Sequence, residues 1–471
     1  MQAVAAKQDL KTIFENQRAN SQRMAATTAA ERRERIKRLE TYLTNEGNRN
    51  RLVEALRADF GKPEVETLTS EVGIVLTHAR YARKRLAGWM KARKVATPIS
   101  LIGTTSYIRY EPKGQALIIS PWNYPVNLSM YPLVCAIAAG CTVVLKPSEV
   151  TTHTSTYLSD MISELYPIEE VAVVLGEADV SQELTSMPFN HIFFTGSPAV
   201  GKKVMAAAAK NLASVTLELG GKSPCIVDET ANLNQVVERI VWAKHFNCGQ
   251  TCVAPDYLLV HESQKEKLIG KYREAIENFY GADPRKSNDY ARVASDKHHS
   301  HLCTLLDDAL DKGAKVLLGG QRDADARYIA PTLVSELSDD AQLLHQEVFG
   351  PIMPLVTYRD LDEAIAFINA RPNPLTLYVM SRSRTNTERI LNRTSAGGSS
   401  INELLLGYAN PGLPFGGVNN SGIGKSFGHH GFLEFSNERS VLRRRFLDLK
   451  MVYPPYPEKK VKFVRWLHRK L

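Results

Sequence analysis

Hydrophobic and polar positions divide the chain into a helical beginning and two long stretches of mixed texture. Apolar residues recur at helical spacing between charged ones over residues 29–61, where Gly61 is placed to end a helix, and again over 76–94. Two short runs typical of β-strands then flank residues 112–114. This arrangement predicts a hairpin or a strand–turn–strand unit.

Continuous apolar runs alternate with helical segments from Gln115 to about Asp228. The runs are ALIIS, TVVLKPS, VAVVLG, HIFFTGS, SVTLELGG and PCIVDE. Strands buried on both faces read as continuous runs, and their alternation with helices predicts βαβ units and a parallel sheet. A second α/β stretch contains YLLVHE, the helix candidate QKEKLIGKYREAIENFYG, AKVLLGG, YIAPTLV, LDEAIAFINA and LTLYVMS. The Gly-rich segment 412–428 lacks apolar periodicity and is predicted to be a loop. The predicted fold class is α/β.

The composition agrees with this prediction. At roughly 150 residues per domain, 471 residues predict two to four domains. The 44% hydrophobic and 23% charged residues are typical of soluble globular proteins. No stretch approaches ~20 continuous apolar residues and no secretory signal is evident, so neither a membrane-spanning helix nor secretion is expected. Six scattered cysteines favour free thiols in a reducing, cytoplasmic compartment.

The net charge of +9 is concentrated near the C-terminus, where residues 442–471 carry +8. The rest of the chain is nearly neutral, so no nucleic-acid partner is expected. One helical face of this tail gathers apolar side chains among Lys and Arg: Val464, Leu467 and Leu471, with Phe463 and Trp466 adjacent. Such a segment fits peripheral contact with an anionic membrane. A tail packed against another subunit, or a solvated tail, fits the same pattern.

Cys252 is the first candidate for chemistry. It lies in FNCGQTCVAPDY, between Gly249 and Pro255, in surroundings typical of a turn. A loop or helix start can lower the pKa of a thiol and expose the sulfur as a nucleophile, whereas a buried, inert thiol is the alternative. Cys248 and Cys252 lack the second Cys/His pair of a zinc site, so no metal site is predicted. The segment 298–301, with three histidines, is expected to be a surface cluster.

Two further side chains are placed to support a nucleophile. Glu218 precedes two glycines at the end of an apolar run, where open α/β sheets place ligands, and can act as a general base. Asn123 lies between Trp122 and Tyr124 on a turn bracketed by prolines, and its amide can donate to a developing oxyanion. A surface glutamate and a turn-forming asparagine are the plain alternatives.

Two strand ends offer phosphate or ribose contacts. FFTGSPAVG places Gly196 and Gly201 in a strand–turn–helix arrangement that can bind phosphate through backbone N–H groups, although GxxxxG differs from the GxGxxG fingerprint. Lys146 and Glu149 follow another strand, where a lysine can reach a ribose or phosphate and a carboxylate can bind ribose hydroxyls. A simple turn and a solvated strand end also fit these segments.

These segments occur in the order and spacing of one superfamily. The chain closely resembles the NAD(P)-dependent aldehyde dehydrogenases, in particular the class 3 branch of fatty and aromatic aldehyde dehydrogenases. Its marks are SPWNYP, KPSE, FTGS, ELGGKSP, CGQTCVAPDY, EVFGP, ANPGLPFGGV and YPPY, spread over nearly the whole chain. The resemblance implies an unusual Rossmann-like cofactor domain, an α/β catalytic domain and a small bridging β element for oligomerisation. The implied bounds are 1–98 and 113–220 for the cofactor domain, 221–420 for the catalytic domain, 99–112 and 430–450 for the bridging element, and 451–471 for a basic tail.

The resemblance also implies roles. Cys252 is the nucleophile, Glu218 the general base and Asn123 the side-chain oxyanion donor. The implied cofactor contacts are Lys146 and Glu149 at the adenosine ribose, Gly196 and Ser197 at the pyrophosphate, Glu347 and Phe349 at the nicotinamide ribose, and Trp122, Gly201 and Leu219 elsewhere. NAD is the expected cofactor because the charge of Glu149 disfavours a 2′-phosphate, with NADP also accepted by class 3 relatives.

The implied reaction is oxidation of a medium- or long-chain aliphatic or an aromatic aldehyde to the acid. It proceeds through a Cys252 thiohemiacetal and a thioester that Glu218-activated water hydrolyses, since CoA-acylating relatives commonly lack this carboxylate. A homodimer is the family expectation. Asn419 stands where class 3 relatives often carry glycine, and His245 is expected to have a packing role. A cofactor-independent thiol hydrolase and a non-catalytic relative are the other hypotheses.

Overall fold

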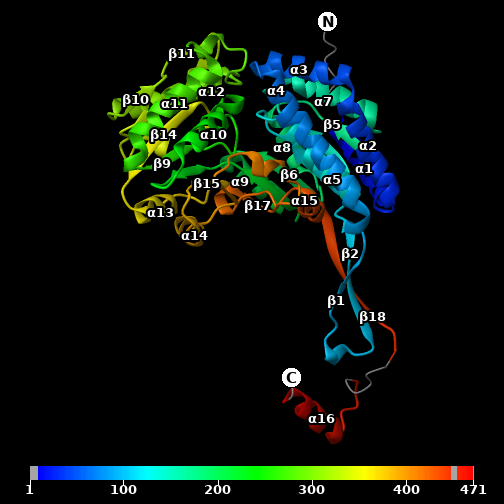
Figure 1. Cartoon of the computed structure of the whole chain (residues 1–471). Coiled ribbons are helices and arrows are strands. Elements are labelled where there is room, and N and C mark those ends of the chain that lie inside the picture. The colour runs from blue at the N-terminus through cyan, green and yellow to red at the C-terminus, as the bar shows by residue number, and fades with distance from the viewer. Residues whose placement is uncertain (1–8, 447–452, 470–471) are drawn as a thin grey trace.

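The computed structural model describes residues 9–446 and 453–469. Two α/β units lie side by side, each on its own sheet, and a narrow arm extends away from them (Figure 1). The apolar runs of the sequence form strands in both sheets, so the expected α/β fold class is confirmed.

The first sheet has six strands in the order β17–β7–β6–β3–β4–β5. Its parallel strands are β3 (Gln115–Ile119), β4 (Thr142–Lys146), β5 (Val171–Val173), β6 (His191–Gly196) and β7 (Ser214–Leu219), and β17 (Gly422–Ile423) is antiparallel to β7. Residues of β3 alternate between two apolar cores: Ala116 and Ile118 join one, and Leu117 and Ile119 join the other. Both faces are therefore covered, which explains the continuous apolar run.

Helices supply the two covers of this sheet. Those that share the core of Leu117 are α1 (Leu10–Ala25), α8 (Ala178–Ser186) and α9 (Pro198–Ala209). Those on the face of Ile118 are α2 (Ala29–Thr44), α3 (Glu46–Phe60), α5 (Ile74–Trp89), α6 (Asn127–Ala139), α7 (Thr152–Leu165) and α15 (Gly428–Glu434). The helical pattern predicted over 29–61 and 76–94 thus belongs to one layer of the first unit as far as Trp89, whereas Arg93 and Lys94 lie in the strand β1 (Arg93–Val95), so the prediction is wrong at its end.

The second sheet has seven strands in the order β10–β13–β14–β9–β8–β15–β16. They are β8 (Pro224–Val227), β9 (Tyr257–His261), β10 (Lys315–Leu318), β13 (Thr332–Ser335), β14 (Ile352–Tyr358), β15 (Thr376–Met380) and β16 (Gly398–Ile401), and β10 alone among them runs antiparallel to its neighbour. Helices α10 (Leu233–His245), α11 (Lys265–Tyr280) and α12 (Asp296–Asp311) cover one face, and α13 (Leu361–Asn369) and α14 (Arg384–Arg393) cover the other. A two-stranded ribbon joins β11 (Arg322–Asp323) to β12 (Tyr328–Ile329).

The chain crosses from the first sheet to the second over residues 220–223, between β7 and β8. The run PCIV, which the pattern grouped with the first stretch, is therefore a strand of the second sheet. Glu218 lies just before this crossing, at the junction of the two units.

The arm is a three-stranded antiparallel sheet of β1 (Arg93–Val95), β2 (Thr104–Pro112) and β18 (Ser436–Arg444). Residues 112–114 do not close a hairpin, because β2 pairs within the arm while β3 pairs within the first sheet. The strand–turn–strand alternative is the one observed. The helix α16 (Glu458–His468) lies at the far end of the arm (Figure 1).

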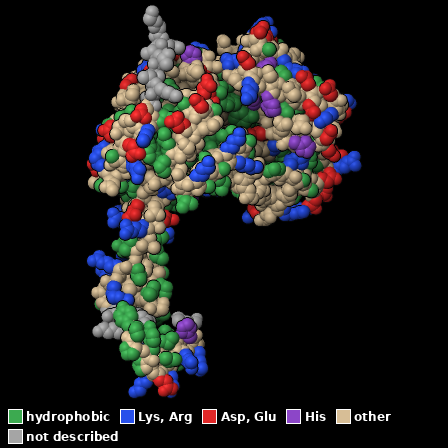
Figure 2. Space-filling model, turned by 180° about the vertical axis from the view of Figure 1, so that it is seen from behind, with side chains coloured by type: hydrophobic (Ala, Val, Ile, Leu, Met, Phe, Trp, Pro, Cys, Tyr) green, Lys and Arg blue, Asp and Glu red, His purple; other side chains and the backbone are tan. Residues whose placement is uncertain are grey.

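Apolar side chains are exposed along the arm and on α16 (Figure 2). On the arm, Ile99 is 77% exposed and Phe446 is 65% exposed, and no residue of α16 is buried within this chain. The predicted helical face of the tail is present in part, and its member Leu471 lies outside the described residues. In the described part of the chain, no helix has the length and apolarity needed to cross a bilayer.

The Gly-rich segment 412–428 is mostly loop, as predicted, but it contains β17 and a short 3₁₀ turn over Asn419–Ser421. Asn419 adopts a left-handed φ of 54°. Asparagine tolerates this conformation better than most residues, so the departure from glycine keeps the turn. Other 3₁₀ helices cover Ile99–Leu101, Phe246–Gly249, Glu262–Gln264, Pro284–Lys286, Gln342–Leu344 and Leu406–Ala409.

Candidate active site

Cys252 follows a tight turn that leads out of α10. Asn247, Cys248 and Gly249 have successive left-handed φ values of 56°, 55° and 74°. A Cβ on Gly249 would collide with the backbone of Gly350, so only glycine fits there. A turn, as the sequence indicated, therefore positions the thiol.

The side chain of Cys252 lies between two cavities. The first has a volume of about 130 Å³ and an apolar lining, and the second has a volume of about 220 Å³. Cys252 lines both of them. A molecule in either cavity can therefore reach the sulfur.

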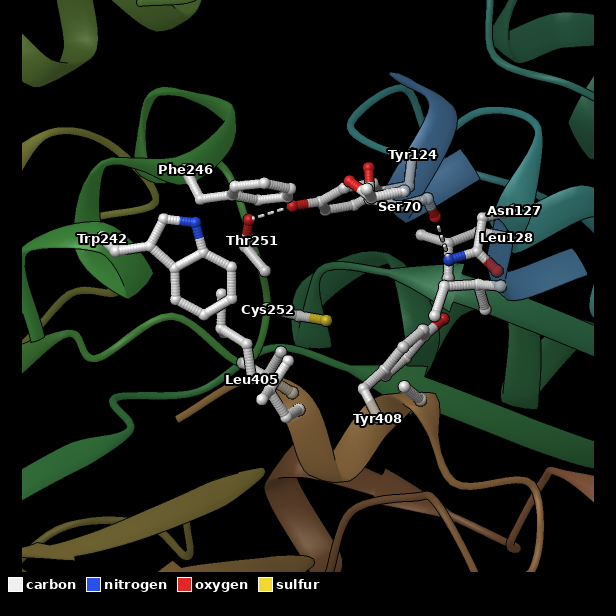
Figure 3. Close-up of a pocket in the computed structure, with 15 residues that line it drawn as sticks. Ser70, Tyr124, Asn127, Leu128, Trp242, Phe246, Thr251, Cys252, Leu405 and Tyr408 are labelled. Carbon is white, nitrogen blue, oxygen red and sulfur yellow. Dashed lines mark hydrogen bonds between the residues drawn. The ribbon is translucent and has the colours of Figure 1, made fainter. Parts of the chain in front are cut away.

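Aromatic side chains enclose the first cavity (Figure 3). Trp242 and Phe246 lie on one side of the sulfur and Tyr408 on the other, while the hydroxyl of Tyr124 lies 2.6 Å from Oγ1 of Thr251. Sequence reasoning did not identify Trp242, Phe246 or Tyr408 as site residues. Trp242 lies on α10, and Phe246 and Tyr408 lie in short 3₁₀ turns; isolated aromatic residues in such segments look like ordinary core residues, so no sequence signal distinguished them.

The second cavity brings together most of the predicted site residues. Those in its lining are Trp122, Asn123, Gly196, Ser197, Glu218, Leu219, Cys252, Glu347 and Phe349. Lys146 and Glu149 lie apart from it, at the carboxyl end of β4, where Nζ and Oε2 form an ion pair of 2.6 Å. Gly201 lies within α9.

Asn123 is buried at a bend between β3 and α6. Its side-chain Nδ2 donates to the backbone carbonyl oxygen of Gln250 at 3.0 Å, and its backbone carbonyl oxygen accepts from Nδ2 of Asn247 at 2.9 Å. An amide nitrogen carries two hydrogens, so one remains free for another acceptor. The side chain of Asn123 is thus held in one orientation with a donor to spare.

Glu218 is buried at the carboxyl end of β7. Its Oε1 accepts from Oγ of Ser426 at 2.6 Å, whereas its buried Oε2 has no partner among the described residues. Burial raises the pKa of Glu218 to about 8, against the opposing effects of the Ser426 hydrogen bond and Lys425. A carboxyl group with a pKa near neutrality is suited to act as a general base.

The thiol of Cys252 departs from the sequence-based expectation. Burial, followed by the carboxylates of Glu347 and Glu218, raises its pKa to about 12. The expectation of a lowered pKa is wrong here, because apolar enclosure outweighs the backbone N–H groups of the turn. The thiol is therefore protonated at neutral pH until a base or a cation acts on it.

Glu347 lines the second cavity and belongs to the unit of the second sheet, in the segment between β13 and β14. Its carboxylate lies so close to Gly220 that a Cβ there would collide with it. Burial, followed by Asp256, raises the pKa of Glu347 to about 8. Asp256 also accepts from the Val348 N–H at 2.8 Å and pairs with Lys222, so the loop that carries Glu347 is fixed.

The start of α9 lies beside the second cavity, where α9 packs closely on β7. Oγ of Ser197 caps this helix by accepting from the Val200 N–H at 3.4 Å. A Cβ on Gly201 would lie 2.7 Å from Cδ2 of Leu219, so glycine lets α9 pack closely on β7. N–H groups at a helix start bind phosphate readily.

His298 also lines the second cavity, which the sequence did not predict. Its ring lies 5.4 Å from that of Trp122 and 6.1 Å from that of Phe349, and its Nε2 donates to the Phe349 carbonyl oxygen at 2.8 Å. Burial lowers the pKa of His298 to about 4. His298 is half-buried and His299 is buried, so the predicted surface cluster is wrong for His299 and only partly right for His298, because this face of α12 packs on distant segments.

The remaining histidine and metal hypotheses concern residues outside the cavities. His245 is buried, and its Nε2 lies 2.8 Å from Oη of Tyr272, which agrees with a packing role. Over residues 9–446 and 453–469, no group of three or more His, Cys, Asp or Glu side chains is arranged to hold a metal ion.

Comparison with known proteins identifies the family of this chain. The model described as "Aldehyde dehydrogenase family" matches residues 2–441. Over 429 residues the chain is 44% identical to 4,4'-diaponeurosporen-aldehyde dehydrogenase of Staphylococcus aureus, covering 91% of this chain and 92% of the relative. Over 430 residues it is 42% identical to the Mus musculus "Aldehyde dehydrogenase, dimeric NADP-preferring", covering 90% of this chain and 94% of the relative.

A solved structure gives the same result. The substrate-bound state of Staphylococcus aureus AldH superposes with a TM-score of 0.92 at 42% identity, covering 98% of this chain and 99% of that chain. The resemblance expected from the motifs is therefore confirmed. The chain belongs to the aldehyde dehydrogenase family and is an aldehyde-oxidising enzyme.

Proposed function

We propose that this enzyme oxidises medium- or long-chain aliphatic or aromatic aldehydes to carboxylic acids with NAD(P)⁺. One observation carries the proposal. Cys252 lies where an apolar cavity meets a second cavity that contains Asn123, Glu218 and the start of α9.

Cys252 is the proposed nucleophile. Its sulfur attacks the aldehyde carbon and forms a thiohemiacetal, whose oxygen develops negative charge. The free amide hydrogen of Asn123 and the backbone N–H of Cys252 donate to this oxygen, and each such donor is typically worth ~3 kcal/mol. The ionised form of Glu218, whose pKa is about 8 and which lines the same cavity as Cys252, is the proposed acceptor of the thiol proton.

Glu218 has a second proposed task. Bound nicotinamide supplies the hydride acceptor, which leaves a thioester on Cys252. Glu218 first releases the thiol proton to solvent and then takes a proton from water. The resulting hydroxide adds to the thioester carbon, and the carbon–sulfur bond breaks, so that the acid departs and the sulfur of Cys252 regains a proton. The position of Glu218 supports hydrolysis rather than transfer to CoA.

The described residues fit a dinucleotide. Gly196, Ser197 and the start of α9 would hold the pyrophosphate, which Gly201 and Leu219 support by close packing. Lys146 and Glu149 would contact the adenosine ribose, and Trp122, Glu347 and Phe349 the nicotinamide end. The ion pair with Lys146 leaves Glu149 46% exposed, so its carboxylate can turn to ribose hydroxyls. The charge of Glu149 favours NAD, and the name of the mouse relative supports NADP as a second cofactor.

The first cavity supports a hydrophobic substrate. A designed apolar cavity of roughly 150 Å³ holds benzene, so a volume of about 130 Å³ fits an aromatic ring or a medium alkyl chain. A longer chain would extend past Leu406, which is 54% exposed at the edge of this cavity.

We also propose a homodimer that acts in the cytoplasm. The exposed apolar side chains of the arm support contact with a second molecule, and the mouse relative is named dimeric. The six free cysteines support a reducing compartment. Peripheral membrane contact through α16 is the alternative use of the tail.

A stopped-flow assay tests the reaction. Enzyme is mixed with hexanal or benzaldehyde and either NAD or NADP, in the absence of CoA, and reduced nicotinamide and carboxylic acid are measured. We expect both products from the wild type and neither from Cys252→Ala. A cofactor-independent thiol hydrolase would instead cleave a thioester without reduced nicotinamide. Absence of reduced nicotinamide with every aldehyde and both cofactors would contradict the proposal.

A further inference from the structure

Three charged residues are buried against the turn that carries Cys252. Lys62 and Glu71 are fully buried and form an ion pair of 2.8 Å, and Glu66 is 8% exposed. Glu66 ends the short helix α4 (Glu64–Glu66), and Glu71 lies in the π-helix over Thr67–Gly73. Charged residues are almost never fully buried unless they are paired, as Lys62 and Glu71 are, and π-helical turns occur frequently at functional sites.

Each carboxylate accepts a backbone N–H from a segment beside the active site. Oε2 of Glu71 accepts from the N–H of Asn127 at 2.8 Å, and Oε2 of Glu66 accepts from the N–H of Asn247 at 2.9 Å. Asn127 begins α6, where an N–H has no partner within the helix. Asn247 begins the left-handed turn before Cys252. The two carboxylates therefore fix both segments that flank the reacting sulfur.

The side chain of Asn247 continues this connection to the oxyanion donor. Its Nδ2 donates to the carbonyl oxygen of Asn123 at 2.9 Å and to that of Gln250 at 3.1 Å. The same Gln250 oxygen accepts from Nδ2 of Asn123 at 3.0 Å. Glu66 is thus connected through Asn247 to the backbone of Asn123 directly, and to its side-chain amide through the shared carbonyl oxygen of Gln250.

Lys62 also contacts the segment that carries Asn123. Its ammonium group lies 4.1 Å from the centre of the Tyr124 ring, and the hydroxyl of Tyr124 contacts Thr251. Tyr124 and Thr251 are the neighbours of Asn123 and Cys252 in the chain. The buried cation therefore contacts the segment that carries the proposed oxyanion donor.

We propose that Glu66 is a positioning residue, which acts through Asn247 to orient the amide of Asn123 and the turn of Cys252. This inference rests on the proposed function, in which Asn123 stabilises the oxyanion. Glu66 itself lines neither cavity that contains Cys252. Its loss should therefore slow the chemical step without weakening cofactor binding.

Three variants test the proposal in the full-length enzyme. Glu66→Ala removes the acceptor, Glu66→Gln keeps an oxygen that accepts the same N–H, and Thr67→Val is the matched control. Thr67 is fully buried beside Glu66, its hydroxyl has no partner among the described residues, and valine has nearly the same shape. The measurements are the rate constant for the first turnover of reduced nicotinamide, the Kd for NAD and the unfolding midpoint.

We expect Glu66→Ala to lower the first-turnover rate constant about tenfold or more, because a misplaced oxyanion donor loses much of its effect. The Kd for NAD should stay within about twofold, since no cofactor contact changes. Glu66→Gln should restore most of the rate, and Thr67→Val should match the wild type. Wild-type rates in folded Glu66→Ala, or equal losses in Glu66→Ala and Glu66→Gln, would overturn the proposal.

A double-mutant cycle decides whether Glu66 acts through Asn123. In an Asn123→Ala background, Glu66→Ala should cause a clearly smaller loss, because only its effect on the turn of Cys252 remains, whereas losses by the same factor in both backgrounds would overturn the proposal. If Glu66→Ala does not fold, Asn247→Gly replaces it, because glycine keeps the left-handed turn and removes the linking amide. Asn247→Gly should then slow the first turnover, and a wild-type rate would overturn the proposal. An inactive wild type would instead refute the proposed function.

Discussion

Ionisation of the buried carboxyl group of Glu218 should lower the stability of the fold and raise the rate of thioester hydrolysis. The variant Glu218→Gln should remove both effects of pH. Burial raises the pKa of this group from 4.5 to about 8. The native state therefore holds a proton that the unfolded chain releases at a lower pH. Binding of this proton therefore contributes to the free energy of unfolding. The contribution is fully present below pH 4.5 and is lost as the pH rises through 8.

The magnitude follows from the size of the shift. A change from 4.5 to about 8 corresponds to roughly 5 kcal/mol of differential free energy. From pH 6 the loss accumulates at about 1.4 kcal/mol per pH unit and levels off above pH 8, so roughly 3 kcal/mol is lost between pH 6 and pH 9. A neutral glutamine has no such dependence. The unfolding free energy of Glu218→Gln relative to wild type should therefore rise by about 3 kcal/mol from pH 6 to pH 9.

Activity should change in the opposite direction. Glutamine cannot take a proton from water, so hydrolysis of the thioester should slow by about a hundredfold. In the wild type, hydrolysis should increase with pH up to about 8, because only the ionised carboxylate acts as a base. Glu218→Gln should lose this dependence and accumulate the thioester.

Denaturant titrations at four pH values and stopped-flow turnover at the same values provide the measurements. Glu183→Gln is the control, because Glu183 is an exposed glutamate on α8. It should change neither the pH dependence of stability nor turnover. A constant stability difference between pH 6 and pH 9, or wild-type hydrolysis in Glu218→Gln, would refute this reasoning.

Three further outcomes are expected. Glu149→Gln should raise kcat/KM for NADP relative to NAD several-fold, since a repulsive charge near the 2′-phosphate is removed, and an unchanged ratio would contradict this. Gly201→Ala should weaken NAD binding and lower Tm because its Cβ would lie 2.7 Å from Leu219, whereas Gly270→Ala, with open space around it, should raise Tm slightly. Trp242→Ala should shift the kcat/KM preference from hexanal toward dodecanal by enlarging the apolar cavity, and an unchanged preference would remove Trp242 from substrate selection.

The strands, and site residues such as Glu218 and Gly196, could be predicted from the sequence for physical reasons. Parallel strands buried on both faces read as continuous apolar runs, and β3 shows this because Ile118 and Ile119 face different cores. Glu218 is the penultimate residue of such a strand and Gly196 the last residue of another, at the edge where open α/β sheets bind ligands. Their placement around one cavity follows from the topology.

The rest depended on packing that no local pattern records. Trp242 and His298 lie on helices whose apolar faces look alike whether they meet a core or a cavity. The thiol of Cys252 was expected to have a lowered pKa from its turn, but its pKa depends on the enclosure assembled by distant segments. The link from Glu66 to Asn247 spans residues far apart in the chain and could not be read from either segment alone.

Enclosure also explains how Cys252, Glu218 and Glu347 can share one small site. Burial raises their pKa values to about 12, 8 and 8, so all three retain protons to a large extent at pH 7. A site that is nearly neutral avoids the penalty of unpaired buried charges, which lets one cavity remain apolar beside the nucleophile. The same low dielectric strengthens a hydrogen bond from Asn123 to an oxygen that becomes charged during the reaction. A cation brought into the second cavity favours the thiolate, so reactivity at Cys252 depends on what occupies that cavity.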